Sequence, residues 1–265
     1  MAWIEANGIR IWCERRGSGP RLLALTGTGG DLRRKPSILD SPLADQFDLA
    51  TFDQRGLGQS DKPEGPYAMA DYARDAEGVL DALGWEQARV IGISFGGLVA
   101  QELAILAPGR VDRLVLCSTA AGGEGGSLYP QHLFHHLTLR EKALHMLPVA
   151  DRRRDAAWQA ANPDIVRRVV EAAEDDPYAS EPEALEGRRK QIDARDGHDA
   201  WDRLHRITAP TLVCIGRYDG QAEPDAQERM ASRIPGAEVR HFEGGHMFMG
   251  QDPTAMGFIA GFLSK

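Results

Sequence analysis

The amino-acid sequence predicts an α/β fold, in which a mostly parallel central sheet is flanked by helices and interrupted by one helical insertion. Two observations support this prediction. Short apolar runs typical of buried strands alternate with segments whose apolar residues recur at helical spacing. From about residue 122 to residue 206 the strand pattern stops, and helical segments with many charges of both signs replace it. A chain of 265 residues with this pattern is expected to form one core rather than two.

The first expected elements are a hairpin and four strands. Asn7 and Gly8 form a strong hairpin-turn signal between the runs AWIEA and RIWCERR. The apolar runs RLLALTG, DLATF, ARVIGI and RLVLCST follow as strands of the buried sheet. Helices are expected over residues 70–83, which end before Gly84, and over residues 98–107, which stop before Pro108.

The α/β pattern returns after the insertion. TLVCIGRYD and AEVRHFEGGH are the strand-like runs, and residues 224–234 and 253–263 are the expected helices. We therefore predict a core made of residues 1–121 and 207–265 and a helical cap made of residues 122–206.

The composition excludes several classes of function. The chain has 39 acidic and 31 basic residues, hence a net charge of −8, and no basic cluster of the kind that binds nucleic acid. No apolar run reaches the ~18 residues of a membrane span, and the start MAWIEANGIRIW does not resemble a signal peptide. Cys13, Cys117 and Cys214 are isolated in strand-like runs and are expected to be buried thiols. We expect a cytoplasmic protein that binds a small molecule, and the oligomeric state stays open.

Ser94 stands among glycines at the junction of a strand and a helix. Residues Gly92 to Gly96 match the pattern G-x-S-x-G, in which a sharp turn lifts a serine hydroxyl above the sheet. Bulky side chains two residues either side would collide in such a turn. The positive end of the following helix would then stabilise negative charge that develops beside the serine.

An acid and a base follow in the order that this chemistry requires. Asp219 comes after the strand TLVCI, and His246 comes after the last strand-like run. Because ligand sites form beyond the carboxyl ends of parallel strands, we expect both groups near Ser94. A serine hydroxyl is a weak nucleophile until a base accepts its proton, and a carboxylate orients that base. Glu223 and Asp225 are alternative acids but lie further from the strand end.

The remaining histidines are weaker candidates. His132, His135 and His136 lie close together, but no acidic residue or cysteine has a spacing that would complete a metal site. We expect them on a helix surface or a cap, and we expect His241 to be structural. The sequence therefore implies no metal.

GISFGG, RYD and GGH together resemble the α/β-hydrolase superfamily over essentially the whole chain. The segment DQRGLGQS, which begins at Asp53, is similar to the D-x-R-G-x-G-x-S segment of that superfamily. Within it, DQRGLGQSDKPEGPY and RLVLCSTAA look most like 3-oxoadipate enol-lactonases. The resemblance implies that Ser94 is the nucleophile, Asp219 the acid and His246 the general base, with no cofactor.

The resemblance also implies an oxyanion hole and a cap. The backbone N–H groups of Phe95 and, by position, Thr28 are the expected oxyanion donors. Many members have His-Gly where this chain has Thr26-Gly27, and small polar residues there are similar to the enol-lactonase branch. A cap sets substrate size and excludes water. Four cap residues are candidate substrate contacts: Trp158, Trp201, Arg188 and Arg189.

The basic run Arg188, Arg189 and Lys190 is suited to a substrate carboxylate, although such a run also fits a solvated helix face. The tryptophans are suited to an acyl pocket or to ordinary packing.

The predicted function is a serine hydrolase that cleaves a carboxylic ester or lactone of a small organic acid through an acyl-enzyme. Two rivals use the same three residues: a C–C bond hydrolase and a cofactor-free haloperoxidase or perhydrolase. Epoxide hydrolases and haloalkane dehalogenases resemble this chain less, because they use aspartate where it has Ser94. The alternative that is not an enzyme is a ligand receptor built on this fold. Repeated turnover of a substrate would distinguish an enzyme from such a receptor.

Overall fold

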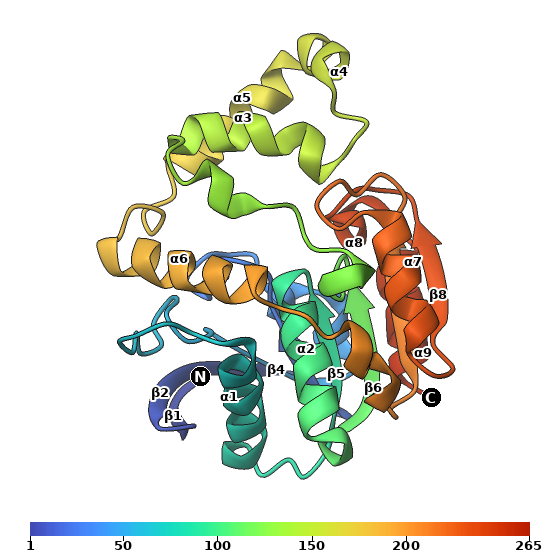
Figure 1. Ribbon diagram of the computed structural model, residues 1–265. Coiled ribbons are helices and arrows are strands. Elements are labelled where there is room, and N and C mark those ends of the chain that lie inside the picture. The colour runs from blue at the N-terminus through green and yellow to red at the C-terminus, as the bar shows by residue number, and fades with distance from the viewer.

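The computed structural model describes all 265 residues, and its centre is one eight-stranded sheet with the order β1-β2-β4-β3-β5-β6-β7-β8 (Figure 1). The strands are β1 (Ala2–Ala6), β2 (Ile9–Arg16), β3 (Arg21–Leu25), β4 (Asp48–Phe52), β5 (Ala88–Ile93), β6 (Val111–Cys117), β7 (Thr211–Gly216) and β8 (Glu238–Phe242). The pairs β1–β2 and β2–β4 are antiparallel, and every other pair is parallel. The α/β class and the hairpin predicted from the sequence are confirmed.

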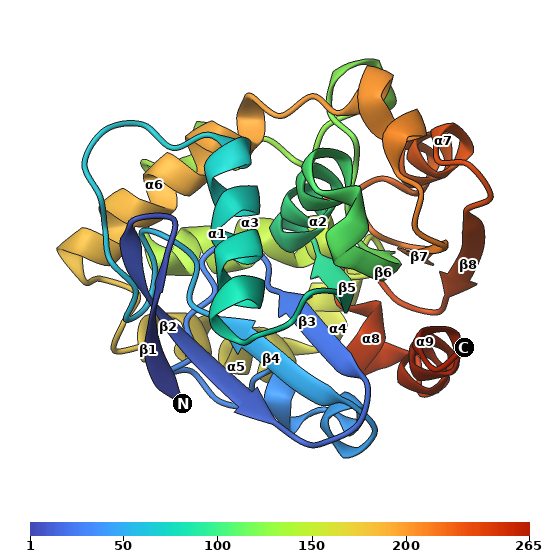
Figure 2. The same ribbon diagram turned by 90° about the horizontal axis from the view of Figure 1, so that it is seen from below.

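Helices cover both faces of the sheet. The core helices are α1 (Met69–Ala82), α2 (Phe95–Leu106), α7 (Pro224–Arg233), α8 (Phe248–Gln251) and α9 (Ala255–Leu263). Three short 3₁₀ helices accompany them: η1 (Ile38–Asp40), η2 (Pro42–Asp45) and η3 (Pro108–Arg110). Figure 2 shows α1 and α2 side by side over one face of the sheet. The helix α9 and the short η1 and η2 pack against the other face.

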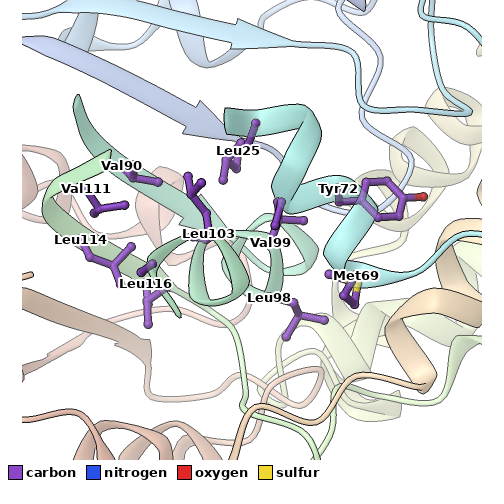
Figure 3. Packing of buried hydrophobic residues seen from close by; sticks show 14 of the residues in the cluster. Leu25, Met69, Tyr72, Val90, Leu98, Val99, Leu103, Val111, Leu114 and Leu116 are labelled. Atoms are coloured by element: carbon purple, nitrogen blue, oxygen red, sulfur yellow. The ribbon is translucent and has the colours of Figure 1, made fainter. Parts of the chain in front are cut away.

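Alternate residues of the central strands enter two separate apolar layers. Leu114 and Leu116 of β6 pack with α1 and α2, whereas Val115 packs with the layer that includes α9. Figure 3 shows Leu98, Val99 and Leu103 of α2 against the strand residues of the first layer. Because side chains of a strand alternate between its two faces, a strand that is apolar throughout must be covered on both.

Several element boundaries differ from those that the sequence predicts, and glycines account for two of these differences. The helix expected from residue 98 begins at Phe95, because the glycines after Ser94 are already helical. The last strand ends at Phe242, and the residues Glu243 to His246 form a loop that returns to the end of β7. Glycines are poor helix and strand formers, so their presence conceals both boundaries in the sequence.

The insertion between β6 and β7 contains helices and no strand of the sheet. It includes η4 (Gly123–Gly125), η5 (Gln131–Phe134), α3 (Leu139–Ala150), α4 (Ala156–Ala161), α5 (Pro163–Glu174), α6 (Pro182–Asp196) and η6 (Trp201–Arg206). An isolated bridge between Gly122 and Asp199 joins its two ends. The last segment, η6, packs on α2 and α7 of the core. The predicted cap, residues 122–206, thus spans this helical insertion, and its final helix contacts the core.

Two other features complete the description. None of the helices has both the length and the apolar character that crossing a membrane would need. Cys13, Cys117 and Cys214 are buried and free, and burial raises the pKa of Cys13 to about 11.

A buried histidine at the junction of cap and core gives the first prediction. His198 is 5 % exposed, and burial lowers its pKa to about 4. Glu102, 3.4 Å away, opposes this shift, but its carboxylate is paired with Arg203 at 2.8 and 2.5 Å. A histidine whose pKa is depressed on folding stabilises the protein above pH 6.5, and this contribution is lost as the pH falls from 6.5 towards 4. We expect the loss at pH 4.5 to be roughly 2–3 kcal/mol.

The measurement is urea unfolding at pH 7 and pH 4.5 for wild type, His198→Met and the exposed-site control His205→Gln. His198→Met should lose less stability on acidification than the wild type, and His205→Gln should behave as the wild type does. Equal losses in all three proteins would contradict the role given to His198.

Candidate active site

Ser94 occupies a strained turn between β5 and α2. Its φ and ψ angles are 54° and −117°, in a region that residues other than glycine rarely adopt. The backbone N–H of Ser94 donates to the carbonyl of Cys117 on β6, at 2.9 Å. Such a conformation costs about 1–3 kcal/mol and persists only where the surrounding structure imposes it. The turn leaves the side chain at the N-terminus of α2, above the carboxyl edge of the sheet.

Close packing explains the two glycines of this turn. A Cβ on Gly96 would collide with the carbonyl group of Leu25 at the end of β3, and a Cβ on Gly92 would lie 2.5 Å from the carbonyl oxygen of Gly96. In both cases the obstacle is backbone, which cannot move aside as a flexible side chain can. The glycines therefore let β3, β5 and α2 meet at one point.

His246 and Asp219 complete a continuous hydrogen-bonded chain with Ser94. The Nε2 of His246 lies 2.9 Å from the Oγ of Ser94, and its Nδ1 lies 2.9 and 3.0 Å from the two carboxylate oxygens of Asp219. Asp219 is fully buried, His246 is 6 % exposed and Ser94 is 8 % exposed. The three side chains come from the ends of β5, β7 and β8, as the sequence predicts.

Backbone groups fix the acid and the base. Oδ1 of Asp219 accepts hydrogen bonds from the N–H groups of Gln221 at 2.8 Å and Ala222 at 3.0 Å. The N–H of His246 donates to the carbonyl of Ala150 at the end of α3, at 2.6 Å. The carbonyl of His246 accepts from the hydroxyl of Ser118 at 2.8 Å. The loop that carries the base is therefore held by both the cap and the sheet.

The alternative acids lie elsewhere. Glu223 is exposed and forms an ion pair with Arg152 at 2.6 Å, and Asp225 is exposed in the first turn of α7. His241 pairs with Glu228 at 3.0 Å, and His132 pairs with Asp196. No group of three histidine, cysteine or acidic residues is arranged to hold a metal ion.

The loop after β3 lies directly beside Ser94. A Cβ on Gly27 would lie 3.5 Å from the Cβ of Ser94, so Thr28 is the next residue after one that packs on the serine. The hydroxyl of Thr28 is buried and has no hydrogen-bond partner. Phe95 is the first residue of α2, where N–H groups have no partner within the helix. The two predicted oxyanion donors thus stand on the two segments that flank Ser94.

The segment DQRGLGQS forms hydrogen bonds that hold the loop after β3 in place. The side-chain amide of Gln54 donates to the carbonyl of Thr26 at 2.8 Å. Asp53 accepts from the N–H groups of Leu32 at 2.7 Å and Gln59 at 2.9 Å, and burial raises its pKa to about 6. Its role in this structure is to position the loop.

Gln191 is a site residue that the sequence analysis missed. It is fully buried on α6, and its Oε1 accepts a hydrogen bond from the N–H of Gly29 at 2.8 Å. Its Nε2 is buried without a partner. The cap therefore contacts the loop after β3 directly and leaves the amide NH₂ group of Gln191 without a partner there. Within a charged run such as RRKQ, sequence gives no sign that the glutamine points inward.

The two arginine candidates have different environments. Arg189 is exposed and pairs within α6 with Glu186 at 2.7 Å and Asp193 at 3.3 Å. The Nε of Arg188 lies 3.5 Å from where a Cβ of Gly29 would be, so its guanidinium packs on the loop after β3. Only Arg188 of this pair is placed against a loop of the site.

The structure does not bring the two tryptophan candidates to the site. Trp201 packs against the core, with Gly125 on one side and the guanidinium of Arg233 4.8 Å from its ring centre. Trp158 lies on α4, where the guanidinium of Arg154 is 5.4 Å from its ring centre. Both rings are used in packing, which is the alternative role that the sequence left open for them.

Comparison with known proteins agrees with this geometry. A family model described as the α/β-hydrolase fold matches residues 20–253. A poly(3-hydroxyalkanoate) depolymerase of Ectopseudomonas oleovorans is 29 % identical over 86 % of this chain and 78 % of its own length. The 3-oxoadipate enol-lactonase 2 of Acinetobacter baylyi is 28 % identical over 80 % of this chain and 76 % of its own length.

A solved structure, the enol-lactonase of Burkholderia xenovorans LB400, covers the whole of both chains with a TM-score of 0.80 and 23 % identity. The fold that the sequence predicts is therefore confirmed. This chain belongs to the α/β-hydrolase fold family and is related to 3-oxoadipate enol-lactonase.

Proposed function

We propose that this protein is a serine hydrolase that cleaves a carboxylic ester or lactone of a small organic acid through an acyl-enzyme. The observation that carries the proposal is the unbroken chain from Ser94 through His246 to Asp219, with 2.9 Å between each pair of partners. Nucleophilic catalysis requires a base within hydrogen-bond reach of the serine hydroxyl, and a strained turn that leaves this hydroxyl accessible to the substrate. Relatives named as a lactonase and a depolymerase support a hydrolytic function.

The mechanism follows from the positions of the groups. Ser94 attacks the carbonyl carbon while Nε2 of His246 accepts its proton, and the buried carboxylate of Asp219 stabilises the imidazolium. The N–H groups of Phe95 and Thr28 stabilise the oxyanion. His246 then protonates the leaving alkoxide and activates the water that releases the acid. For a lactone the leaving oxygen stays tethered, so the product is one ring-opened hydroxy acid or its tautomer.

The test is turnover of a parallel substrate panel. It contains nitrophenyl esters of increasing acyl length, simple lactones and 3-oxoadipate enol-lactone, each assayed with wild type and Ser94→Ala. Repeated turnover that depends on Ser94 supports the proposal. Turnover of lactones far above esters identifies a lactonase, and the reverse identifies an esterase. No turnover of any member would overturn the proposal and favour the C–C hydrolase or the receptor.

Gly187 provides a prediction about the cap. A Cβ at this position of α6 would collide with the backbone carbonyl group of Gly56, so the helix rests directly on the DQRGLGQS segment. Gly187→Ala should displace α6, and with it the contact of Gln191 to Gly29, and reduce kcat/KM about 10- to 100-fold. The enzyme assay uses the best substrate of the panel, and thermal unfolding reports the accompanying loss of stability.

The matched control is Gly197→Ala at the other end of α6. The nearest atoms to a Cβ there are 3.8 Å away, and the φ angle of −85° suits alanine. If both variants kept wild-type activity, close contact between α6 and Gly56 would not be needed for catalysis.

A further inference from the structure

His246 lies on a loop that leaves the edge of the sheet. The strand before it, β8, is the last strand of the sheet and pairs only with β7. Its first three residues are exposed. Ser94 and Asp219, by contrast, follow β5 and β7, which have neighbouring strands on both sides. The base is therefore the member of the three that the sheet supports least, so the contacts of its loop decide where the imidazole lies.

The end of α3 contacts two consecutive residues of this loop. The N–H of His246 donates to the carbonyl of Ala150 at 2.6 Å. A Cβ on Gly245 would collide with that carbonyl oxygen and would lie 2.7 Å from the Cα of Asp151, so the loop backbone packs directly on the cap. Figure 1 shows this end of α3 next to the loops around α8. The cap therefore limits the position of the base loop from outside the sheet.

Two side chains extend this contact between loop and cap. Gln251 lies at the end of α8, and its Oε1 accepts a hydrogen bond from the N–H of Gly245 at 2.7 Å. Its Nε2 donates to Oδ2 of Asp151 at 3.2 Å. A reversed amide would set donor against donor at Gly245 and acceptor against acceptor at Asp151. The orientation of the Gln251 amide is therefore fixed, with its acceptor towards the base loop and its donor towards the cap.

Asp151 is itself held firmly. It is 2 % exposed, and its Oδ1 accepts hydrogen bonds from the N–H and Nε of Arg153 at 3.1 and 2.9 Å. Its Oδ2 accepts a third from the same guanidinium at 2.7 Å. Burial opposes ionisation of Asp151, but the hydrogen bonds from Arg153 outweigh burial and lower its pKa. The guanidinium also lies 4.4 Å from the ring centre of Tyr218, the residue before Asp219. Asp151 is therefore a fixed carboxylate between the acid and base loops.

We propose that Gln251 and Asp151 are positioning residues for His246, because the Gln251 amide joins the fixed carboxylate of the cap to the backbone of the base loop. This inference rests on the proposed function, in which His246 is the base. Both side chains act through the backbone of Gly245 and not through contact with the reacting atoms. The imidazole must stay within reach of Ser94 and Asp219 together, and a displacement of about 1 Å can cost about 100-fold in rate.

The first test removes the Gln251 amide and keeps its approximate shape. Gln251→Met should lower kcat about 10- to 50-fold on the best substrate of the panel and change KM less than about threefold, because the base is displaced while the substrate contacts remain. Glu243→Gln is the control, since Glu243 lies in the same loop but is exposed and pairs with Arg217 at 3.2 Å. It should keep the wild-type kcat. A wild-type kcat in Gln251→Met would overturn the inference.

An exchange of the two partners tests the hydrogen bond itself. Gln251→Glu sets a carboxylate against that of Asp151. Asp151→Asn sets an NH₂ group against that of Gln251, because Oδ1 must remain the acceptor for Arg153. Each single variant should lower kcat about tenfold or more.

The double variant Gln251→Glu/Asp151→Asn restores a donor that faces an acceptor. Its new amide can donate to its new carboxylate, which still accepts from Gly245, so kcat should return to within about threefold of the wild type. Thermal unfolding identifies any variant that is not folded, and the exchange remains decisive if Gln251→Met is one of these. Losses that add in the double variant would overturn the inference.

Proton NMR separates failure of this inference from failure of the proposed function. The proton on Nδ1 of His246, which faces the carboxylate of Asp219, should give a downfield resonance in the wild type that is absent from His246→Ala. It should broaden or disappear in Gln251→Met and Gln251→Glu and return in the double variant. This pattern without turnover of any panel member would count against the proposed function alone. A wild type without the resonance, or Gln251→Met with an unchanged one, would overturn the inference even for an active hydrolase.

Discussion

Replacing Ser94 with alanine is expected to reduce kcat by roughly 10⁴ to 10⁶, with little change in KM for the best substrate. In the proposed mechanism this hydroxyl forms the acyl-enzyme, and its 2.9 Å contact with His246 provides the route for its proton. The residual rate would come from the oxyanion donors and from substrate binding, which the substitution leaves in place. The fold should be unaffected, since alanine removes one oxygen from a side chain that is 8 % exposed.

His246→Ala and the double variant Ser94→Ala/His246→Ala test whether the two residues act as one unit. All three variants should have nearly the same rate, because a base has no function without the nucleophile that it serves. Ser264→Ala is the control, since the hydroxyl of Ser264 lies at the end of α9, where it donates to the carbonyl of Ala260 at 2.8 Å. Additive losses in the double variant would contradict a shared mechanism.

A covalent label gives a second measurement that does not depend on the natural substrate. A phosphonate ester reagent should add to Ser94, and peptide mass spectrometry should locate the adduct on the peptide that contains it. Labelling should be lost in Ser94→Ala and slowed in His246→Ala, because the base is needed to activate the hydroxyl. Labelling of another serine at an equal rate would exclude Ser94 as the activated nucleophile.

The sheet and the candidate active site are largely predictable from sequence because their signals are local. Ser94 and Asp219 follow the buried strands β5 and β7, His246 follows the edge strand β8, and parallel strands bring their carboxyl ends to one edge. Gly96 is required by its contact with the backbone of β3, and Gly92 by its contact with the backbone of Gly96, so both positions are fixed within two residues of the serine. Short-range pattern and fold topology therefore suffice to bring these three residues together.

The cap is less predictable because its orientation is set by contacts that no local pattern records. Arg188, Arg189 and Lys190 look alike in sequence, but the contact of Gly187 with Gly56 turns Arg188 towards the site and Arg189 towards solvent. Trp201 is a large aromatic residue of the kind that often lines a ligand pocket. It begins η6, however, and this helix packs on the core. The direction in which a cap residue points depends on how its helix sits on the core, which is a tertiary property.

Asp219→Asn is expected to reduce kcat by about 10⁴ through the protonation state of His246. Oδ1 of Asp219 accepts two backbone N–H groups, from Gln221 and Ala222. An asparagine must place its carbonyl oxygen there, which puts its NH₂ group in the position of Oδ2, 2.9 Å from Nδ1 of His246. Although the carbonyl oxygen lies 3.0 Å from Nδ1, it already accepts the two backbone N–H groups, so the nearer NH₂ group favours an Nδ1 that accepts a hydrogen bond. The proton of the neutral imidazole then moves to Nε2, which can no longer accept one from Ser94.

Two matched variants distinguish this effect from a general loss of negative charge. Glu223→Gln and Asp225→Asn remove neighbouring acids that are exposed and do not contact His246, so both should retain wild-type kcat. Asp219→Ala provides the comparison within the site, because it leaves Nδ1 without either a donor or an acceptor and does not impose the wrong tautomer. If catalysis depends on the tautomer, Asp219→Asn should be at least as slow as Asp219→Ala, whereas a faster asparagine variant would show that an amide oxygen can orient the imidazole. Asp219 would then act mainly through its charge. The two backbone hydrogen bonds that it accepts would not determine which nitrogen of His246 carries the proton.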